Sequence, residues 1–132
     1  MTRLSFIFPE LPYSELNPNN LRRTHWSNRA GVEAMAREEA RLLAIHSRVP
    51  RLELELVEVE YIFTLPDKHS RDLDNLAGAC KPWLDGLVDA GILIKDDCWH
   101  VKKLTAGVRY QKGVQQTEII INEVKEDEEA GD

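Results

Sequence analysis

The amino-acid sequence predicts a single α+β domain in which a mixed β-sheet packs against two main helices. Its 132 residues are enough for one hydrophobic core and too few for two. Apolar side chains recur at three- and four-residue spacing over residues 29–46 and again over 73–88, as on one face of a helix. Around these segments lie short stretches with the apolar composition or the alternation of β-strands.

The first strand and the first helix are separated by a long polar segment. Residues 4–8 form a short apolar run that Pro9 ends, so we expect a strand there. A segment rich in Pro, Asn and Ser follows, up to about Asn28, and loops of this length within a domain are usually functional or mobile. Ser27 or Asn28 is a good N-cap for the helix 29–46, which we expect to end before Pro50.

The remaining predicted elements are, in chain order, one strand, a second helix and two further strands. Residues 52–65 alternate, but the phase changes near residues 56–57, which predicts a bulge or a strong twist in one long strand. The helix 73–88 contains Pro82, which should kink it or begin it again. Gly91 is expected to stop this helix. Strands 99–109 and 115–124 are predicted to form a final hairpin around the turn 111–113.

Charge is distributed unevenly along the chain. The formal net charge is −6, but residues 125–132 hold one lysine and five acids, so residues 1–124 carry only −2. We therefore expect a globular domain over 1–124 and a disordered acidic tail over 125–132. Arg22, Arg23 and Arg29 lie in a stretch without acids, and Lys68 and Arg71 form a second basic group. Such local patches can bind a polyanion, although ordinary solvated faces have the same composition.

The composition also excludes several classes of protein. No run of 18 apolar residues is present, so no transmembrane helix and no membrane partner are expected. The two cysteines, Cys80 and Cys98, form neither a disulfide framework nor a paired zinc motif. We interpret them as reduced, largely buried thiols of a cytoplasmic protein.

The most informative residues are the two carboxylates of the sequence Asp72-Leu73-Asp74. They follow a predicted strand and precede a predicted helix, and in an extended segment side chains at i and i+2 point the same way. Paired oxygen ligands suit Mg²⁺ or Mn²⁺ better than zinc. A third carboxylate near Asp97, at the start of the next strand, would complete a metal site that cleaves phosphodiesters. The alternative is that the aspartates only cap the helix, since aspartate is common at helix starts.

The pair Asp96-Asp97 leaves one choice open. Neighbouring residues of an extended segment point to opposite faces, so at most one of the two should reach a site built by Asp72 and Asp74. The apolar pattern on either side does not decide between them. Both can also cap a turn after Gly91 and face water.

The segment from Arg71 to Val101 resembles the RusA family of Holliday junction resolvases. The family pattern has D-x-D-N-L, a lysine, D-(A/G)-L, a small residue with glycine, and D-D before a strand. The matching residues are Asp72, Asp74, Asn75, Leu76, Lys81, Asp85, Gly86, Leu87, Ala90, Gly91, Asp96 and Asp97. The order of elements in the rest of the chain is more loosely similar. The chain departs from the pattern in a longer spacing before Lys81 and in Pro82 directly after it.

This resemblance implies a homodimeric, Mg²⁺-dependent endonuclease that nicks four-way DNA junctions symmetrically. Carried over to this sequence, the metal ligands would be Asp72, Asp74 and Asp97, and Lys81 would lie near the scissile phosphate. Water would be the nucleophile, Mn²⁺ could replace Mg²⁺, and Arg22, Arg23, Arg29, Lys68 and Arg71 would contact DNA. Flaps or forks are alternative substrates. The alternative of a different class is a non-catalytic branched-DNA-binding or scaffold protein that retains the fold.

Overall fold

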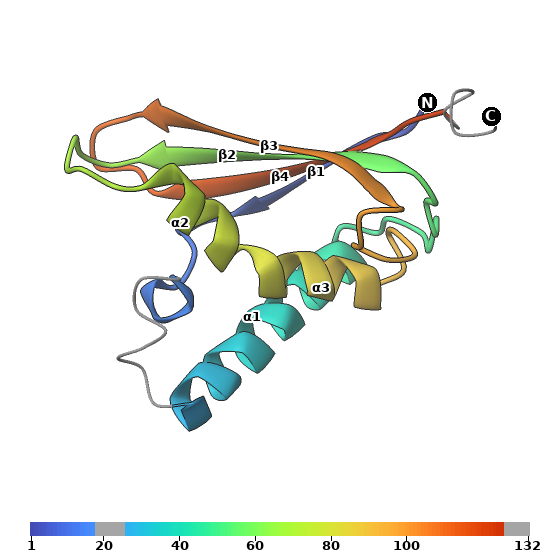
Figure 1. Cartoon of the computed structure of the whole chain (residues 1–132), viewed down its shortest axis with the longest axis horizontal. Helices are drawn as coiled ribbons and strands as arrows, with labels where there is room; N and C mark the ends of the chain where they lie inside the picture. Colours follow the sequence, from blue (N-terminus) through green and yellow to red (C-terminus); the bar gives the residue numbers. More distant parts are fainter. Residues whose placement is uncertain (18–25, 126–132) are drawn as a thin grey trace.

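The computed structural model describes residues 1–17 and 26–125, and it shows one α+β domain (Figure 1). Arg22, Arg23 and the acidic residues 126–132 lie outside the described residues. The strands are β1 (Arg3–Phe8), β2 (Val57–Leu65), β3 (Val101–Tyr110) and β4 (Gln116–Glu123). The helices are α1 (Trp26–His46), α2 (Leu73–Ala79) and α3 (Lys81–Asp89), with a short 3-10 helix, η1, at Ser14–Leu16. The predicted class, a mixed sheet with helices, is confirmed.

The four strands form one sheet in the order β1-β4-β2-β3. Strand β4 pairs antiparallel with both β1 and β2, whereas β2 and β3 are parallel. The predicted final hairpin is therefore wrong: a turn does join β3 to β4, but β2 lies between them in the sheet. The chain returns from the end of β2 to the start of β3 through α2 and α3, as a parallel pair requires.

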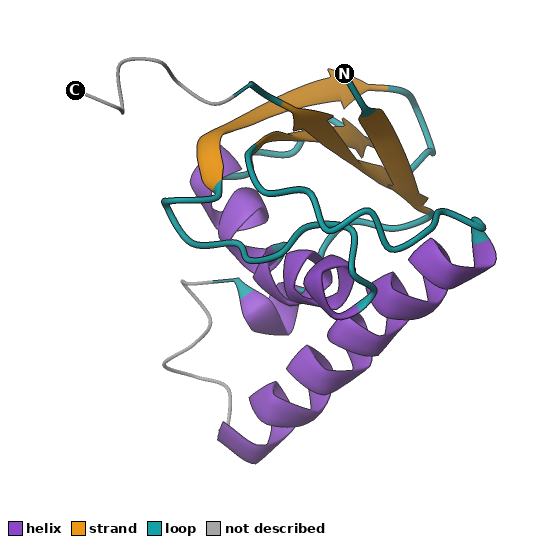
Figure 2. Cartoon of the chain, turned by 90° about the vertical axis from the view of Figure 1, so that its right-hand side faces the viewer, coloured by secondary structure: helices purple, strands orange, loops and turns teal. Residues whose placement is uncertain are grey.

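The sheet buries one face against the helices (Figures 1 and 2). Alternate residues of β2 point into the core, which also receives Trp83 and Leu87 of α3. Trp83 is 1% exposed and stacks on Phe8 with ring centroids 4.1 Å apart, so it lies in the core. The buried apolar residues on β2 are Val57, Val59, Tyr61 and Phe63.

Two predicted boundaries differ in the structure. The alternation over residues 52–56 belongs to no strand of the sheet, because Glu53 has a φ of 49° and only Leu54 forms a bridge, to Leu93. The register shift in the β2–β3 pairing falls between Val57 and Glu58, close to the predicted slip. Helix α1 begins at Trp26, so the predicted caps at residues 27 and 28 lie inside its first turn.

The second helix is interrupted where the sequence predicts a kink or a restart. Helix α2 ends at Ala79, and Pro82 occupies the first turn of α3, where its missing N–H costs no helical hydrogen bond. Cys80 joins the two helices and is buried, which raises the pKa of its thiol. Cys98 is exposed, so the prediction of buried thiols is wrong for this residue; both cysteines are free.

Helices α1 and α3 cross at very short range. Ala36, Ala40 and Ala44 of α1 are buried, and a Cβ on Gly86 of α3 would lie 2.1 Å from the carbonyl oxygen of Arg37. The backbones can approach this closely only because both helices present small residues.

Within residues 1–17 and 26–125, no helix combines the length and the apolar character that a bilayer crossing needs.

The Gly86 contact gives a first prediction. Gly86→Ala should lower the free energy of unfolding by about 1–3 kcal/mol, because α1 must move away from α3 to admit the methyl group. The control is Gly31→Ala on α1, where a Cβ meets nothing within 4 Å and alanine favours the helix. Urea unfolding of both variants measures the effect. Equal stability of Gly86→Ala and the wild type would contradict the described crossing.

Candidate functional site

Asp72 and Asp74 are held together by the residue that follows them. Asp72 is the N-cap of α2 and has an extended backbone, while Asp74 lies in the first helical turn. The side-chain amide of Asn75 donates a hydrogen bond to Asp72 Oδ2 (3.3 Å), and its backbone N–H donates one to Asp74 Oδ1 (3.0 Å). Asn75 is 7% exposed. The two carboxylates therefore lie at the start of a helix, and not in the predicted extended segment, and both accept hydrogen bonds from Asn75.

Both carboxylates remain available to a ligand. Asp72 and Asp74 are exposed, and neither forms an ion pair with any residue in the described part of the chain. Asp72 lines a cleft of about 650 Å³ between the segment 10–17 and α2. The other polar side chains around this cleft include Glu10, Tyr13, Glu15, Arg71 and Asn75.

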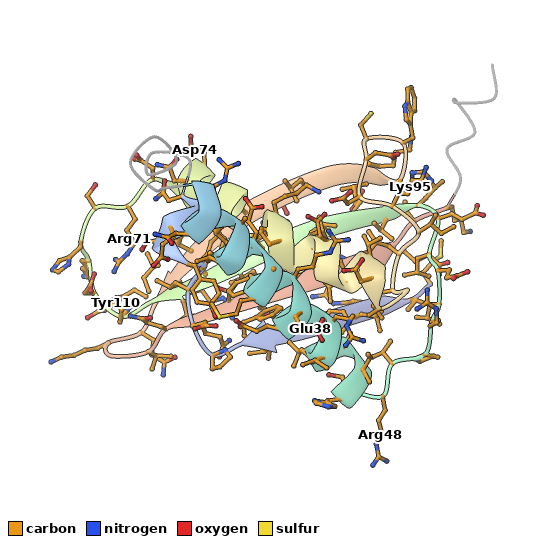
Figure 3. All side chains as sticks on the ribbon, turned by 90° about the horizontal axis from the view of Figure 1, so that it is seen from below. Glu38, Arg48, Arg71, Asp74, Lys95 and Tyr110 are labelled. Atoms are coloured by element: carbon orange, nitrogen blue, oxygen red, sulfur yellow. The ribbon has the colours of Figure 1, made fainter. Side chains whose placement is uncertain are left out.

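The cation closest in sequence, Arg71, is fixed by the loop before α2. Asp67 accepts two hydrogen bonds from its guanidinium, at 2.7 and 3.3 Å, and a third from the backbone N–H of His69. The hydrogen bonds from Arg71 and His69 lower the pKa of Asp67 to about 2. The Lys68 ammonium lies 5.1 Å from the ring centroid of Tyr110, at the end of β3. Figure 3 shows Arg71 and Tyr110 at the same end of the molecule as Asp74.

Asp97 lies elsewhere, in the turn before β3. Its Oδ1 accepts the backbone N–H of Trp99 (3.0 Å) and contacts His100 Nδ1 (2.5 Å), and its carbonyl oxygen accepts the backbone N–H of Val101 (2.9 Å). The contact with His100 lowers the pKa of Asp97. The capping role that the sequence left open is thus the one that Asp97 plays in this chain.

One chain does not gather the three predicted metal ligands. Asp72 follows the end of β2 and Asp97 precedes the start of β3, and in a parallel pair these are opposite ends. Figure 3 shows this separation through Asp74 and Lys95, which lie far apart along the molecule. Among residues 1–17 and 26–125, no group of three or more Asp, Glu, His or Cys side chains is arranged to hold a metal ion. The described chain therefore does not bring Asp97 to Asp72 and Asp74, and the site of three aspartates stays a prediction.

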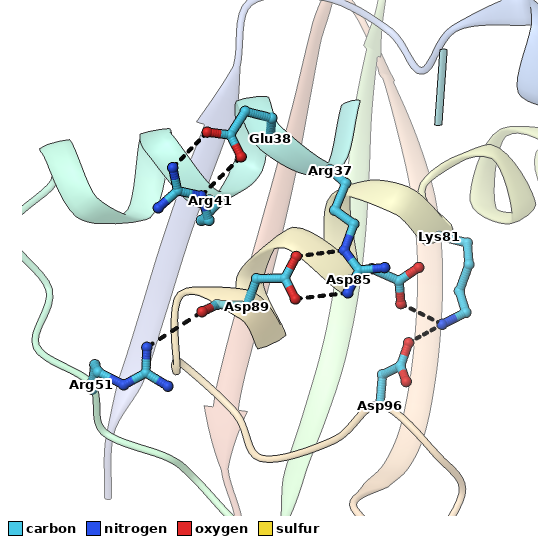
Figure 4. Close-up of polar contacts among 8 residues, drawn as sticks. All are labelled: Arg37, Glu38, Arg41, Arg51, Lys81, Asp85, Asp89 and Asp96. Carbon is cyan, nitrogen blue, oxygen red and sulfur yellow. Dashed lines mark hydrogen bonds and ion pairs between the residues drawn. The ribbon is translucent and has the colours of Figure 1, made fainter. Parts of the chain in front are cut away.

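Lys81 forms ion pairs with two carboxylates that do not belong to the Asp72–Asp74 pair. Its ammonium contacts Asp85 Oδ1 at 2.7 Å and also contacts Asp96 (Figure 4). Burial raises the pKa of Asp85, and the neighbouring Asp96 adds to the rise although Lys81 opposes it. Burial also acts to raise the pKa of Asp96, but hydrogen bonds with Lys81 and Asp85 outweigh it, and that pKa is lowered. The motif lysine therefore belongs to a charge cluster with Asp96, away from Asp72.

This charge cluster borders a second cleft, of about 490 Å³, between α1 and the α2–α3 segment. Arg29 lines it and pairs with Glu33 at 3.2 Å, so the predicted DNA contacts Arg29 and Arg71 belong to different clefts. Arg37 of α1 binds both oxygens of Asp89, at 2.5 and 2.7 Å (Figure 4). Asp89 is exposed, whereas Asp85 is partly buried.

Some of these partners were readable from the sequence and others were not. Lys81 and Asp85 are four residues apart on one helix, a spacing that favours an ion pair. Asp67 and Arg71 have the same spacing, although they lie in a loop. Arg37 and Asp89 meet only because α1 crosses α3, so no local pattern indicates their pairing.

Comparison with known proteins adds no family: no protein-family model and no curated protein matches the chain.

The Lys81 cluster predicts a pH-dependent effect on stability. Lys81 lowers the pKa of Asp96 in the folded protein. The ion pair therefore stabilises the fold fully above the ordinary carboxyl pKa of 3.8, and this stabilisation is lost as the pH falls through the lowered pKa of Asp96. In Lys81→Met, Asp85 and Asp96 face each other without a cation. The loss of stability should therefore be small at about pH 3 and should increase towards about pH 7.

Urea midpoints across this pH range test the prediction. Lys112→Met, in the exposed turn after β3, is the control and should show no such trend. A loss in Lys81→Met that is equal at both ends of the pH range would contradict the described cluster.

Proposed function

We propose that this protein is a RusA-like, Mg²⁺-dependent endonuclease that cleaves branched DNA at four-way junctions. The observation that carries the proposal is the pair Asp72–Asp74. Asn75 binds both of these exposed carboxylates, neither has an ion pair within residues 1–17 and 26–125, and Asp72 lines a cleft. Two carboxylates that served only as helix caps would not need a buried amide to orient one of them. Cations that suit a phosphate backbone, Lys68 and Arg71, lie at the same end of the molecule.

The donor set fits the metal. Mg²⁺ keeps several waters and is commonly bound by one or two carboxylates together with phosphate oxygens, so a protein need not enclose it. Asp72 and Asp74 would hold the ion, which lowers the pKa of a bound water and neutralises charge on the phosphate. Arg71, fixed by Asp67, would keep the DNA backbone in the cleft beside Asp72. Asn75 would keep the carboxylate of Asp72 turned towards that site.

A second copy of the chain would supply the third aspartate. Strand β3 is an edge strand, and Leu104 and Val108 on its helix-facing side are each 53% exposed. Antiparallel pairing of two β3 strands places the start of one strand beside the end of the other. Tyr110 is the last residue of β3, and Lys68, in the loop before Asp72, contacts it. Asp72 therefore lies near the end of β3 of its own chain. The second copy's Asp97 would then approach Asp72 and Asp74, so the proposed enzyme is a homodimer.

The alternative is a non-catalytic protein that binds or organises branched DNA with the same fold. One observation favours it: a single chain does not gather the three aspartates. Such a protein would bind a four-way junction with or without Mg²⁺ and would leave the DNA intact. Turnover in the presence of the metal separates the two functions.

The proposal predicts that Asp72→Asn or Asp74→Asn lowers the rate of junction nicking by about a thousandfold or more, since the bound metal supplies several kcal/mol. Affinity for the junction without Mg²⁺ should be unchanged or higher, because each change removes a negative charge near phosphate. The measurement is single-turnover cleavage of a synthetic four-way junction, with and without Mg²⁺, compared with linear duplex.

Glu38→Gln is the matched control, because it removes one exposed carboxylate on α1 and should leave nicking unchanged. Nicking by Asp72→Asn at nearly the wild-type rate would show that the metal site is assigned wrongly. A wild-type chain that binds the junction tightly but never nicks it would support the non-catalytic alternative.

A further inference from the structure

The turn before β3 presents an indole to solvent. Trp99 is 73% exposed, the highest value among the large apolar side chains of the described residues. Its backbone is not free, because the N–H of Trp99 binds Asp97 Oδ1 and the next two N–H groups bind the carbonyl oxygen of Asp97. Together with the exposed Leu52 and Ile94 in the same groove, this indole forms an apolar patch of the kind found at binding surfaces.

Cations lie next to this indole. The Lys102 ammonium is 5.5 Å from the ring centroid of Trp99, within the range of a cation–π contact. Lys103 follows it on β3 and is exposed, and Lys95 lies close enough to Asp97 to lower the pKa of that carboxyl. An aromatic face with neighbouring lysines suits a nucleotide, whose base stacks while its phosphate pairs with the ammonium groups.

A groove of about 620 Å³ beside Trp99 gives the base a place to lie. Leu52, Leu56 and Ile94 supply apolar walls, and three carboxylates, those of Glu53, Glu55 and Glu123, lie around it. Glu53 pairs with Arg51 at 3.6 Å, and Glu123 accepts the backbone N–H of Thr2. Glu55 is exposed, and no hydrogen bond or ion pair joins it to another described residue. Carboxylates repel phosphate but accept N–H groups from base edges, so the phosphate belongs on the lysine side.

We propose that Trp99 stacks on an unpaired base of branched DNA, with Lys102 beside the phosphate of that nucleotide and Glu55 facing its amino edge. This inference rests on the proposed DNA partner, but it does not require cleavage. It assigns to the turn a second role, in binding a base, beside the metal-ligand role proposed for Asp97 of the same turn. Base stacking is interrupted where the arms of a four-way junction meet, so a base there is easier to unpair than one in a continuous duplex, and the site favours a junction.

The test uses a four-way junction with 2-aminopurine at the branch point, in Ca²⁺ without Mg²⁺, so that binding is measured apart from cleavage. Wild-type protein should quench the 2-aminopurine fluorescence by stacking. Trp99→Ala should weaken junction affinity about tenfold and lose the quenching, because the base loses its stacking on the indole. Trp99→Phe should retain most of the affinity.

Met35→Ala, which removes a 48% exposed apolar side chain on α1, is the control and should bind as the wild type does. Sedimentation of Trp99→Ala should give the wild-type mass; a variant that changes only its oligomeric state would place Trp99 in a protein interface and overturn the inference. Unchanged junction affinity, or an equal loss for continuous duplex, would also overturn it. Quenching by Trp99 in a protein that never nicks DNA would support the base site while contradicting the proposed enzyme.

Discussion

The parallel pairing of β2 with β3 is the constraint from which most of this structure follows. A parallel pair cannot be closed by a tight turn, so the chain must return along the sheet through α2 and α3 before β3 begins. This return covers the core with Trp83 and its neighbours and presses α3 against α1 at Gly86. It also separates the two acidic parts of the central motif. Asp72 and Asp74 lie at the start of the crossover helices, whereas Asp96 and Asp97 follow them.

Local patterns predicted the elements better than they predicted the arrangement of the strands. The helix 29–46, the interruption at Pro82 and the strands around residues 4–8 and 115–124 depend on periodicity and breakers, which act over a few residues. The order of strands depends on contacts across the chain, and a turn at Gly113 does not show that β2 separates the strands on either side of it. The positive φ of Glu53 likewise overrides an alternation that looks regular in sequence.

The candidate site shows the same division. The two aspartates of the motif and their nearness were predictable, because they are two residues apart; their orientation by Asn75 depends on where α2 begins. The distance between Asp97 and this pair depends on the direction of β3 relative to β2, which no local signal contains. Trp99 was not singled out because exposure is a property of the folded chain. Its turn nevertheless uses the same Asp97 that the motif highlights.

Mixed dimers of two inactive variants test the central claim, that the active centre combines Asp72 and Asp74 of one chain with Asp97 of a second copy. Asp72→Asn and Asp97→Asn should each abolish junction nicking as separate proteins. A heterodimer of the two contains one site in which all three aspartates are intact. Mixing and re-equilibrating the variants should therefore restore nicking to a substantial fraction of the wild-type rate. A mixture that stays inactive although heterodimers form would contradict the account.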